Sequence, residues 1–242
     1  MSRFLRIAHR GASGQFPENT QIAFEKALEA HADMIELDCQ LCGDGHVVVF
    51  HDETLWRRAA VRGLVREQTL AQLQQLQIGG WRRRSLARQR ILKLEEAIEV
   101  IGGRADLCID IKLFARSHPG IELKLLFILS HYDYLERTIF SSFDYRCLGR
   151  VRELAPEARI GLIYSRAVKE DPFVAAERLG AASIHLDKRA ASGDFLKHAW
   201  EKGLDVYLWT VNRPSEIERF AALGVQGIFS DFPERLWLGR RF

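Results

Sequence analysis

Short apolar runs alternate with segments of helical periodicity along most of the chain. We interpret the apolar runs as buried strands because they are short and rich in Ile, Leu, Val and Phe. Eight such runs occur, at residues 4–8, 33–40, 104–112, 137–143, 158–164, 182–186, 204–211 and 225–231. Helical spacing predicts helices at 20–30, 120–131, 144–154, 192–202 and 214–223, the first capped by Asn19 or Thr20. This alternation predicts parallel strand pairing.

The number of strands and the length of the chain together indicate a fold class. Eight strands, mostly followed by helices, in 242 residues match the size of a (β/α)₈ barrel. We therefore predict an α/β fold, a TIM-like (β/α)₈ barrel that forms a single domain over residues 1–242, with a doubly wound open sheet as the alternative. Residues 43–92 depart from the repeat, with an extra apolar piece at 46–50 and then an Arg- and Gln-rich segment. We interpret them as a small insertion between strands two and three.

Polar side chains gather where the predicted strands end, which is where barrels of this class carry their active sites. Four pairs stand at such positions: His9 with Arg10, Glu36 with Asp38, His51 with Asp52, and Asp110 with Lys112. Alternate residues of a strand share a face, so the second and fourth pairs can each point together into the barrel mouth.

Three of these residues, Glu36, Asp38 and Asp110, are carboxylates from two strands. Converging oxygen ligands suit a hard divalent cation, Mg²⁺ or Ca²⁺, and without a cation the three like charges would repel. The alternative is that each carboxylate caps a helix or pairs with an arginine. We predict that the three form a divalent-cation site.

The remaining polar residues at the strand ends suit an anionic substrate. Arg10 and Lys112 add fixed positive charge, for which phosphate is the natural ligand. His9 and His51 can serve as general acid and base near neutral pH, in an order that the sequence leaves open. Phosphodiester cleavage needs all of these groups. We expect the other histidines to be structural or solvated; they are residues 31, 46, 118, 131, 185 and 198.

Composition excludes several classes of protein. A chain that is 47% hydrophobic and 28% charged is typical of a globular fold, and a net charge of +3 does not by itself indicate nucleic-acid binding. Polar residues interrupt the first ten positions too early for a secretion signal, and the apolar run at 125–129 is too short to span a membrane. We therefore expect a cytoplasmic protein without stable membrane insertion.

Four cysteines stand at positions 39, 42, 108 and 147, and the first two form a C-x-x-C. A redox pair usually opens a helix, whereas this one runs into the turn GDGH. His46 and His51 could in principle complete a zinc site with it, but no second C-x-x-C follows. We expect small buried thiols in a reducing compartment.

Eight short motifs follow one another along nearly the whole chain: HRG at 9–11, PENT at 17–20, ELD at 36–38, HDETL at 51–55, DIK at 110–112, SSF at 141–143, WTVN at 209–212 and GVQGIFSDFP at 224–233. In this order and spacing they resemble the glycerophosphodiester phosphodiesterase family. The resemblance implies a TIM-like barrel that cleaves glycerophosphodiesters, such as glycerophosphocholine, into glycerol 3-phosphate and an alcohol with a divalent cation.

The resemblance also implies roles for single residues. His9 and His51 look like the acid–base pair, and Arg10 and Lys112 look like the phosphate contacts. Glu36, Asp38 and Asp110 look like the metal ligands. Glu18 resembles the family's carboxylate near the metal and the glycerol, with Asn19 in a supporting role. Phe143 and Trp209 would surround the glycerol or the leaving alcohol, with core packing as the alternative.

The chain departs from the family pattern in three places. The family often has glutamate where this chain has Asp110, an acidic or small polar stretch where it has WRRAAVRG, and a proline that the segment WRRRSLARQR at 81–90 lacks. The Arg-rich segment 82–90 supports a second hypothesis, a non-catalytic barrel that binds nucleic acid or anionic lipid, although a solvated face is the ordinary interpretation.

A third hypothesis is a phospholipase D-like activity on lysophospholipids, which shares the chemistry and needs apolar surface around the mouth. We prefer a small-molecule glycerophosphodiester as the substrate, attacked by its own glycerol hydroxyl to give a cyclic phosphate that is then hydrolysed. Direct attack by water is the alternative. The leaving alcohol, the choice between Mg²⁺ and Ca²⁺, and the oligomeric state stay open.

Overall fold

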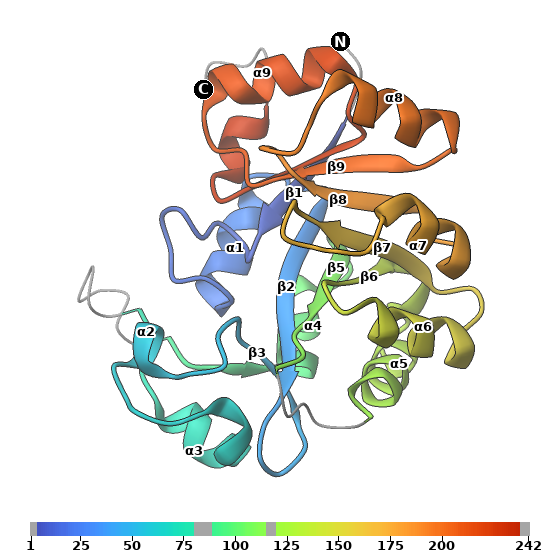
Figure 1. Cartoon of the computed structure of the whole chain (residues 1–242). Coiled ribbons are helices and arrows are strands. Elements are labelled where there is room, and N and C mark those ends of the chain that lie inside the picture. The colour runs from blue at the N-terminus through green and yellow to red at the C-terminus, as the bar shows by residue number, and fades with distance from the viewer. Residues whose placement is uncertain (1–3, 80–88, 115–119, 238–242) are drawn as a thin grey trace.

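The computed structural model describes residues 4–79, 89–114 and 120–237. Eight parallel strands close into a barrel, which confirms the predicted fold (Figure 1). Strand β1 pairs with both β2 and β10, so the ring is closed and the open sheet is excluded. Each strand lies within two residues of its prediction. The strands are β1 (Leu5–His9), β2 (Met34–Leu41), β5 (Asp106–Ile111), β6 (Thr138–Ser142), β7 (Arg159–Tyr164), β8 (Ser183–Asp187), β9 (Asp205–Trp209) and β10 (Gly227–Ser230).

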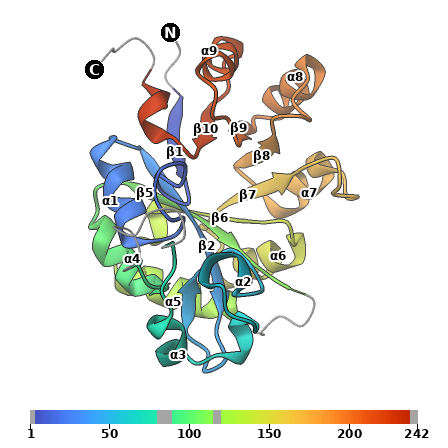
Figure 2. The ribbon, with the colours of Figure 1, turned by 90° about the vertical axis from the view of Figure 1, so that its left-hand side faces the viewer.

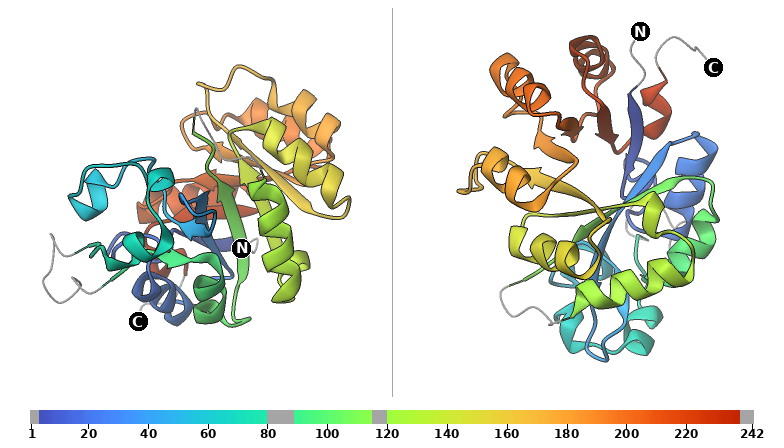
Figure 3. Two further views of the ribbon diagram at one scale, coloured as in Figure 1. Left: turned by 90° about the horizontal axis from the view of Figure 1, so that it is seen from below. Right: turned by 90° about the vertical axis from the view of Figure 1, so that its right-hand side faces the viewer.

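Helices surround the strands and cover the outside of the barrel (Figure 3). They are α1 (Gln21–Glu29), α4 (Leu94–Ile101), α5 (Ile121–His131), α6 (Tyr145–Leu154), α7 (Pro172–Leu179), α8 (Gly193–Glu201) and α9 (Pro214–Leu223), with single turns η3 (Leu135–Arg137) and η4 (Pro233–Leu236). Thr20, not Asn19, caps α1. Helix α7 was not predicted, although Asp171 caps it and proline occupies its first turn.

Side chains inside the barrel form a separate apolar layer that closes it below the mouth. This layer contains Ile7, Met34, Cys108, Ile139, Tyr207 and Phe229. Two glycines make room for Tyr207 of this layer and for His185, which stacks on it. A Cβ at Gly161 would come within 2.4 Å of His185 Nε2, and one at Gly227 within 2.7 Å of Tyr207 Cδ1. Only glycine allows so close an approach. The interior of the barrel is therefore a packed apolar core and not a channel.

The predicted insertion lies between β2 and the third barrel strand, β5, and projects beside the barrel mouth (Figure 2). It contains β3 (Val47–Val49), α2 (Trp56–Ala59), η1 (Val65–Glu67), α3 (Leu70–Gln75) and β4 (Leu92–Lys93), with β3 antiparallel to both β2 and β4. Its own small core consists of Cys42, Val48, Phe50, Leu55, Val65, Leu73, Ile78 and Ile91. Of the Arg-rich segment 82–90, residues 82–88 lie outside the described residues.

The structure bears on two further expectations, which concern the cysteines and membrane-spanning helices. All four cysteines are buried and form no disulfide, as predicted. Within the described ranges, no helix is both long enough and apolar enough to cross a bilayer.

Candidate active site

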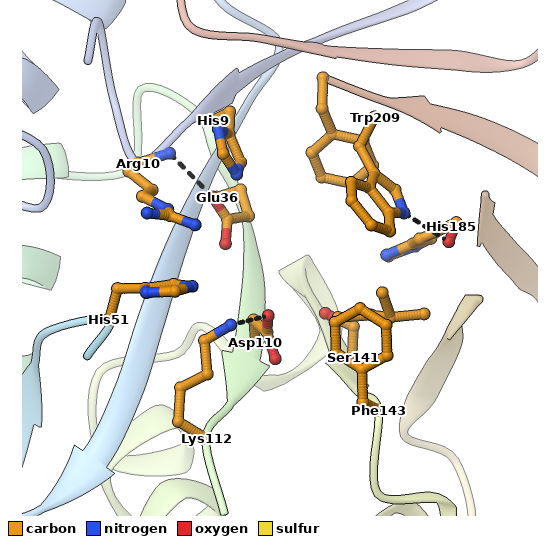
Figure 4. Close-up of a pocket in the computed structure, with 12 residues that line it drawn as sticks. His9, Arg10, Glu36, His51, Asp110, Lys112, Ser141, Phe143, His185 and Trp209 are labelled. Atoms are coloured by element: carbon orange, nitrogen blue, oxygen red, sulfur yellow. Dashed lines mark hydrogen bonds and ion pairs between the residues drawn. The ribbon is translucent and has the colours of Figure 1, made fainter. Parts of the chain in front are cut away.

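A cavity of about 220 Å³ opens at the carboxyl ends of the barrel strands (Figure 4). Its lining contains most of the site residues predicted from the sequence, whereas Glu18, Asn19 and Asp38 are not part of it. The lining residues are His9, Arg10, Glu36, His51, Asp110, Lys112, Ser141, Phe143, Ile163, His185, Trp209 and Phe229. The fold thus brings polar residues from distant parts of the chain to one place.

The three predicted metal ligands form one buried cluster. Asp38 on β2 pairs in register with Asp110 on β5, and Glu36 lies two residues earlier on the same face. One oxygen from each carboxylate lies within 4.8 Å of the others. Burial raises the pKa of Glu36 to about 7, and the charge of Asp38 adds to this. Burial also raises the pKa of Asp110. Ionisation of Glu36 and Asp110 is therefore less favourable here than in water.

This cluster fits a hard divalent cation. Lys112 Nζ lies 2.5 Å from Asp110 Oδ2 and 3.0 Å from Asp38 Oδ1. Asp110 Oδ1, however, is buried and receives no hydrogen bond from any residue that the structure describes. A buried charged oxygen without a partner is costly, and carboxylate oxygens are the ligands that Mg²⁺ and Ca²⁺ prefer. The donor set suits either ion.

His9 is tied to the last strand of the barrel. Its Nδ1 lies 2.6 Å from Asp231 Oδ1, and the Asp231 carboxylate also accepts from Ser13 Oγ at 3.0 Å and Asn212 Nδ2 at 2.7 Å. Burial opposes protonation of His9, but the bond to Asp231 and the charge of Glu36 outweigh it and raise its pKa. The bond through Nδ1 fixes the ring and leaves Nε2 for the cavity.

His51 has a carboxylate partner of the same kind, the adjacent Asp52, whose Oδ1 lies 2.7 Å from His51 Nδ1. The turn that carries both residues is held by Gln40 Nε2, which donates to the carbonyls of Phe50 at 2.8 Å and Asp52 at 2.9 Å. Burial lowers the pKa of His51, and the nearby Lys112 also opposes its protonation. The two histidines are therefore held alike but have pKa values displaced in opposite directions.

The two predicted phosphate contacts are held at the edge of the acidic cluster. Arg10 has a left-handed backbone with φ of 57°, and its backbone N donates to Glu36 Oε2 at 2.8 Å. Its Nε lies 3.1 Å from Asp38 Oδ2. Asn19, also left-handed with φ of 58°, donates to the same Asp38 oxygen at 2.7 Å. Asn19 thus supports a metal-ligand candidate, whereas Arg10 both supports it and lines the cavity.

Glu18 lies in a cluster of arginines outside the cavity lining. Its carboxylate accepts from Arg57 Nη2 at 2.7 Å, from Arg10 Nη1 at 3.3 Å and from Arg58. Burial opposes ionisation of Glu18, but these arginines outweigh it and lower its pKa. The two arginines of α2 belong to the stretch in which the sequence departs from the family pattern, so the motifs carried no signal for this arrangement.

The opposite side of the cavity is aromatic and apolar. The rings of Phe143 and Trp209 meet edge to face, with 6.0 Å between their centroids. Trp209 Nε1 donates to the carbonyl of His185 at 2.8 Å, which fixes the indole. Phe143 keeps 46% of its surface exposed at the mouth. Ile163 and Phe229 complete this side of the lining.

His185 and Asp231 are among the residues of the site that received no role from the sequence. His185 was predicted to be structural or solvated; it is buried, lines the cavity and stacks on Tyr207 with 5.2 Å between ring centroids. Burial lowers its pKa to about 3, so the ring is neutral. Asp231 lies in the last motif, and its position at the end of the strand that closes on β1 was the signal that could have paired it with His9.

Comparisons with known proteins point to one family. The model of the glycerophosphoryl diester phosphodiesterase family matches residues 9–235. A glycerophosphodiester phosphodiesterase of Caldanaerobacter subterraneus is 40% identical over 96% of both chains, and one of Bacillus altitudinis is 33% identical over 95% of both. The structure of an Oleispira antarctica phosphodiesterase in complex with sn-glycerol 3-phosphate superposes with a TM-score of 0.88 at 30% identity, covering 97% of this chain and 95% of the other.

Proposed function

This chain belongs to the glycerophosphoryl diester phosphodiesterase family, and on that premise we propose that it hydrolyses glycerophosphodiesters to sn-glycerol 3-phosphate and an alcohol. The observation that carries the proposal is that an acidic cluster, two histidines bound to carboxylates and two positively charged side chains, Arg10 and Lys112, meet at one cavity. The product bound to the Oleispira antarctica relative supports the same product here.

Glu36, Asp38 and Asp110 would hold a divalent cation, Mg²⁺ or Ca²⁺, which supplies positive charge beside the phosphoryl oxygens when it is bound. Arg10 and Lys112 line the same side of the cavity and bind the anionic oxygens of the diester from the protein itself. Both side chains keep their charge: burial opposes protonation of Lys112, but Asp38 and Asp110 outweigh it and raise its pKa.

The substrate supplies its own nucleophile in the first step. His51 takes the proton of the glycerol hydroxyl next to the phosphate, and that oxygen attacks phosphorus. The bond from phosphorus to the alcohol oxygen breaks as His9 donates its proton to that oxygen. The products of this step are a cyclic glycerol phosphate and the free alcohol.

The second step reverses the proton transfers. His9, now neutral, takes a proton from water, whose oxygen attacks the cyclic phosphate. His51 returns its proton to the glycerol oxygen as the ring opens. Glycerol 3-phosphate leaves, and both histidines regain their first protonation states.

The surroundings of the two histidines support the order of acid and base that we propose. Asp231 and Glu36 favour the protonated form of His9 against the effect of burial, and the raised pKa suits a general acid. Burial favours the neutral form of His51, and the lowered pKa suits a general base. On the other side of the cavity, Phe143 and Trp209 pack against the glycerol carbons or the leaving alcohol.

The test is release of glycerol 3-phosphate by the purified full chain. Glycerophosphocholine and glycerophosphoethanolamine are supplied with Mg²⁺, with Ca²⁺ or with EDTA. A choline lysophospholipid is tested separately, with release of choline as the measurement. We expect release from the soluble diesters that requires a cation and is lost in His9→Ala. Turnover of the lysophospholipid alone would favour the phospholipase D-like hypothesis, and no turnover of any substrate would refute the proposed hydrolysis.

A further inference from the structure

Helix α2 presents two neighbouring arginines that differ in one contact. Arg57 and Arg58 both bind the carboxylate of Glu18, which follows β1. Arg57 alone also binds Asp52, the partner of His51. The pair is therefore a natural comparison within the molecule.

Arg57 holds the Asp52 carboxylate by both of its oxygens. Its Nε donates to Oδ2, and its Nη2 lies 2.7 Å from Oδ1. Oδ1 is the same oxygen that lies 2.7 Å from His51 Nδ1. The guanidinium continues to Glu18, with Nη2 2.7 Å from Oε1 and Nη1 3.3 Å from Oε2. A two-point contact between planar groups fixes the orientation of a carboxylate as well as its charge.

The core of the insertion holds in place the backbone that carries Arg57. Leu55, two residues earlier, is 1% exposed and packs in the insertion's own core. Its backbone N donates to Gly63 O at 3.1 Å, and its carbonyl accepts from Ala59 N at 2.9 Å. Arg66 pairs with Glu53 just before this residue. The backbone of α2 is thus held independently of the ion pairs that its arginines make.

The carboxylate partners of the two histidines differ in how many other side chains bind them. Asp231 is held against His9 by two neutral donors, Ser13 and Asn212. In the described ranges, the Asp52 carboxylate has side-chain partners only in His51 and Arg57. Without Arg57 it would be free to turn away from the imidazole.

We propose that Arg57 is a positioning residue for the diesterase reaction: it locks Asp52, and through it the His51 ring, and joins this unit to Glu18 on the loop after β1. The inference rests on the proposed function. Arg57 does not line the cavity, and carboxylates occupy its guanidinium, so it acts through Asp52 and not on the substrate. A carboxylate that orients a general base is known to affect turnover more than substrate binding.

The test compares Arg57→Ala with Arg58→Ala in the full chain with glycerophosphocholine. We expect kcat to fall about tenfold to a hundredfold in R57A, as when other outer partners of a site are removed, with KM changed less than about threefold. R58A, which also loses a contact to Glu18, is expected to stay within about threefold of the unmodified protein. Thermal unfolding of both variants shows what the lost contact to Glu18 costs in stability. Arg57→Lys, which keeps the charge but not the planar guanidinium, should have a kcat between those of R57A and the unmodified protein.

A double-mutant cycle separates the route through Asp52 from the route through Glu18. In an Asp52→Asn background, removal of Arg57 should cost little more, whereas in Glu18→Gln it should cost nearly its full amount. Equal losses in R57A and R58A, or an undiminished loss in the Asp52→Asn background, would overturn the proposal. An unmodified protein without diesterase turnover would refute the proposed function instead, so the two failures are distinguishable. If R57A fails to fold, Arg57→Gln takes its place.

Discussion

The two sides of the cavity differ in origin and in the forces that hold them. The charged side comes from β1, β2, β5 and the insertion, and ion pairs such as Lys112 with Asp110 fix its geometry. The aromatic side comes from β6 to β10, and ring packing such as Phe143 against Trp209 fixes it. On the proposed mechanism the two sides have different tasks, so changes to the histidines of the charged side should reduce kcat, and changes to the rings of the aromatic side should raise KM.

The largest effects are expected for the histidines of the charged side. His9→Ala should lower kcat for glycerophosphocholine by about 10²- to 10⁴-fold, because the choline oxygen leaves without a proton. The same variant should be much less impaired on a glycerol p-nitrophenyl phosphate, whose leaving group needs no acid. His51→Ala should be impaired on both substrates. Single-turnover rates of alcohol release from the two diesters, which report the first step alone, decide this, and equal losses of His9→Ala on both would contradict its role as the acid.

The acidic cluster should make the stability of the fold depend on divalent cations. EDTA-treated protein is expected to gain about 2.7 kcal/mol in free energy of unfolding when Mg²⁺ or Ca²⁺ reaches a hundred times its Kd. Asp110→Asn, which removes charge from the oxygen that lacks a partner, should abolish most of this gain. Thermal melts across a cation titration measure both, with Asp194→Asn, at an exposed position on α8, as the matched control. A cation-independent melting temperature would contradict the proposed site.

A neutral histidine on the aromatic side should make the fold sensitive to acid. The pKa of His185 is about 3 in the folded state and about 6.5 in the unfolded state, so the unfolded chain binds the extra proton between these values. Its contribution to stability is complete above pH 6.5 and declines as the pH falls, by at most about 1.4 kcal/mol per pH unit. Urea unfolding at pH 7.5 and 5.5 should show a smaller loss in His185→Gln than in the unmodified protein; parallel losses would contradict this.

The smallest effect is expected at the mouth. Phe143→Ala should raise KM for glycerophosphocholine about two- to fivefold, the worth of an exposed aromatic contact with a cation, and leave kcat within about twofold. Its half-exposed ring makes a loss of stability small. Glycerophosphoglycerol, which carries no cation, provides the control. A fall in kcat of Phe143→Ala without a change in KM would contradict the assignment of substrate binding to the aromatic side.

The barrel strands were predictable because buried parallel strands are continuous apolar runs, and the eight found here stand out from the polar helices between them. Glu36, Asp38 and Asp110 were predictable for a related reason, since alternate positions at strand ends share the barrel mouth. The elements of the insertion were less accessible because turns as short as α2 carry weak periodicity. Helix α7 was not predicted for a different reason, because its buried stripe is small and rich in alanine.

Contacts between distant segments could not be derived from local pattern. The pairing of His9 with Asp231 spans 222 positions and exists only because the barrel closes. The arginines on Glu18 come from a stretch with no counterpart among the motifs. His185 is in the interior of strand β8. At such a position the sequence looks the same whether the side chain lines the cavity or only packs in the core.

The contact between the first and last strands also sets a condition on biosynthesis. A nascent chain that has been synthesised as far as Lys112 already contains the residues of the acidic cluster, Arg10 and His51, whereas the carboxylate partner of His9 is absent until Asp231 has been synthesised. The ring itself cannot close before β10 arrives. Completion of the site must therefore wait for β10, and a chain that stops before that strand has neither a closed barrel nor a carboxylate at His9.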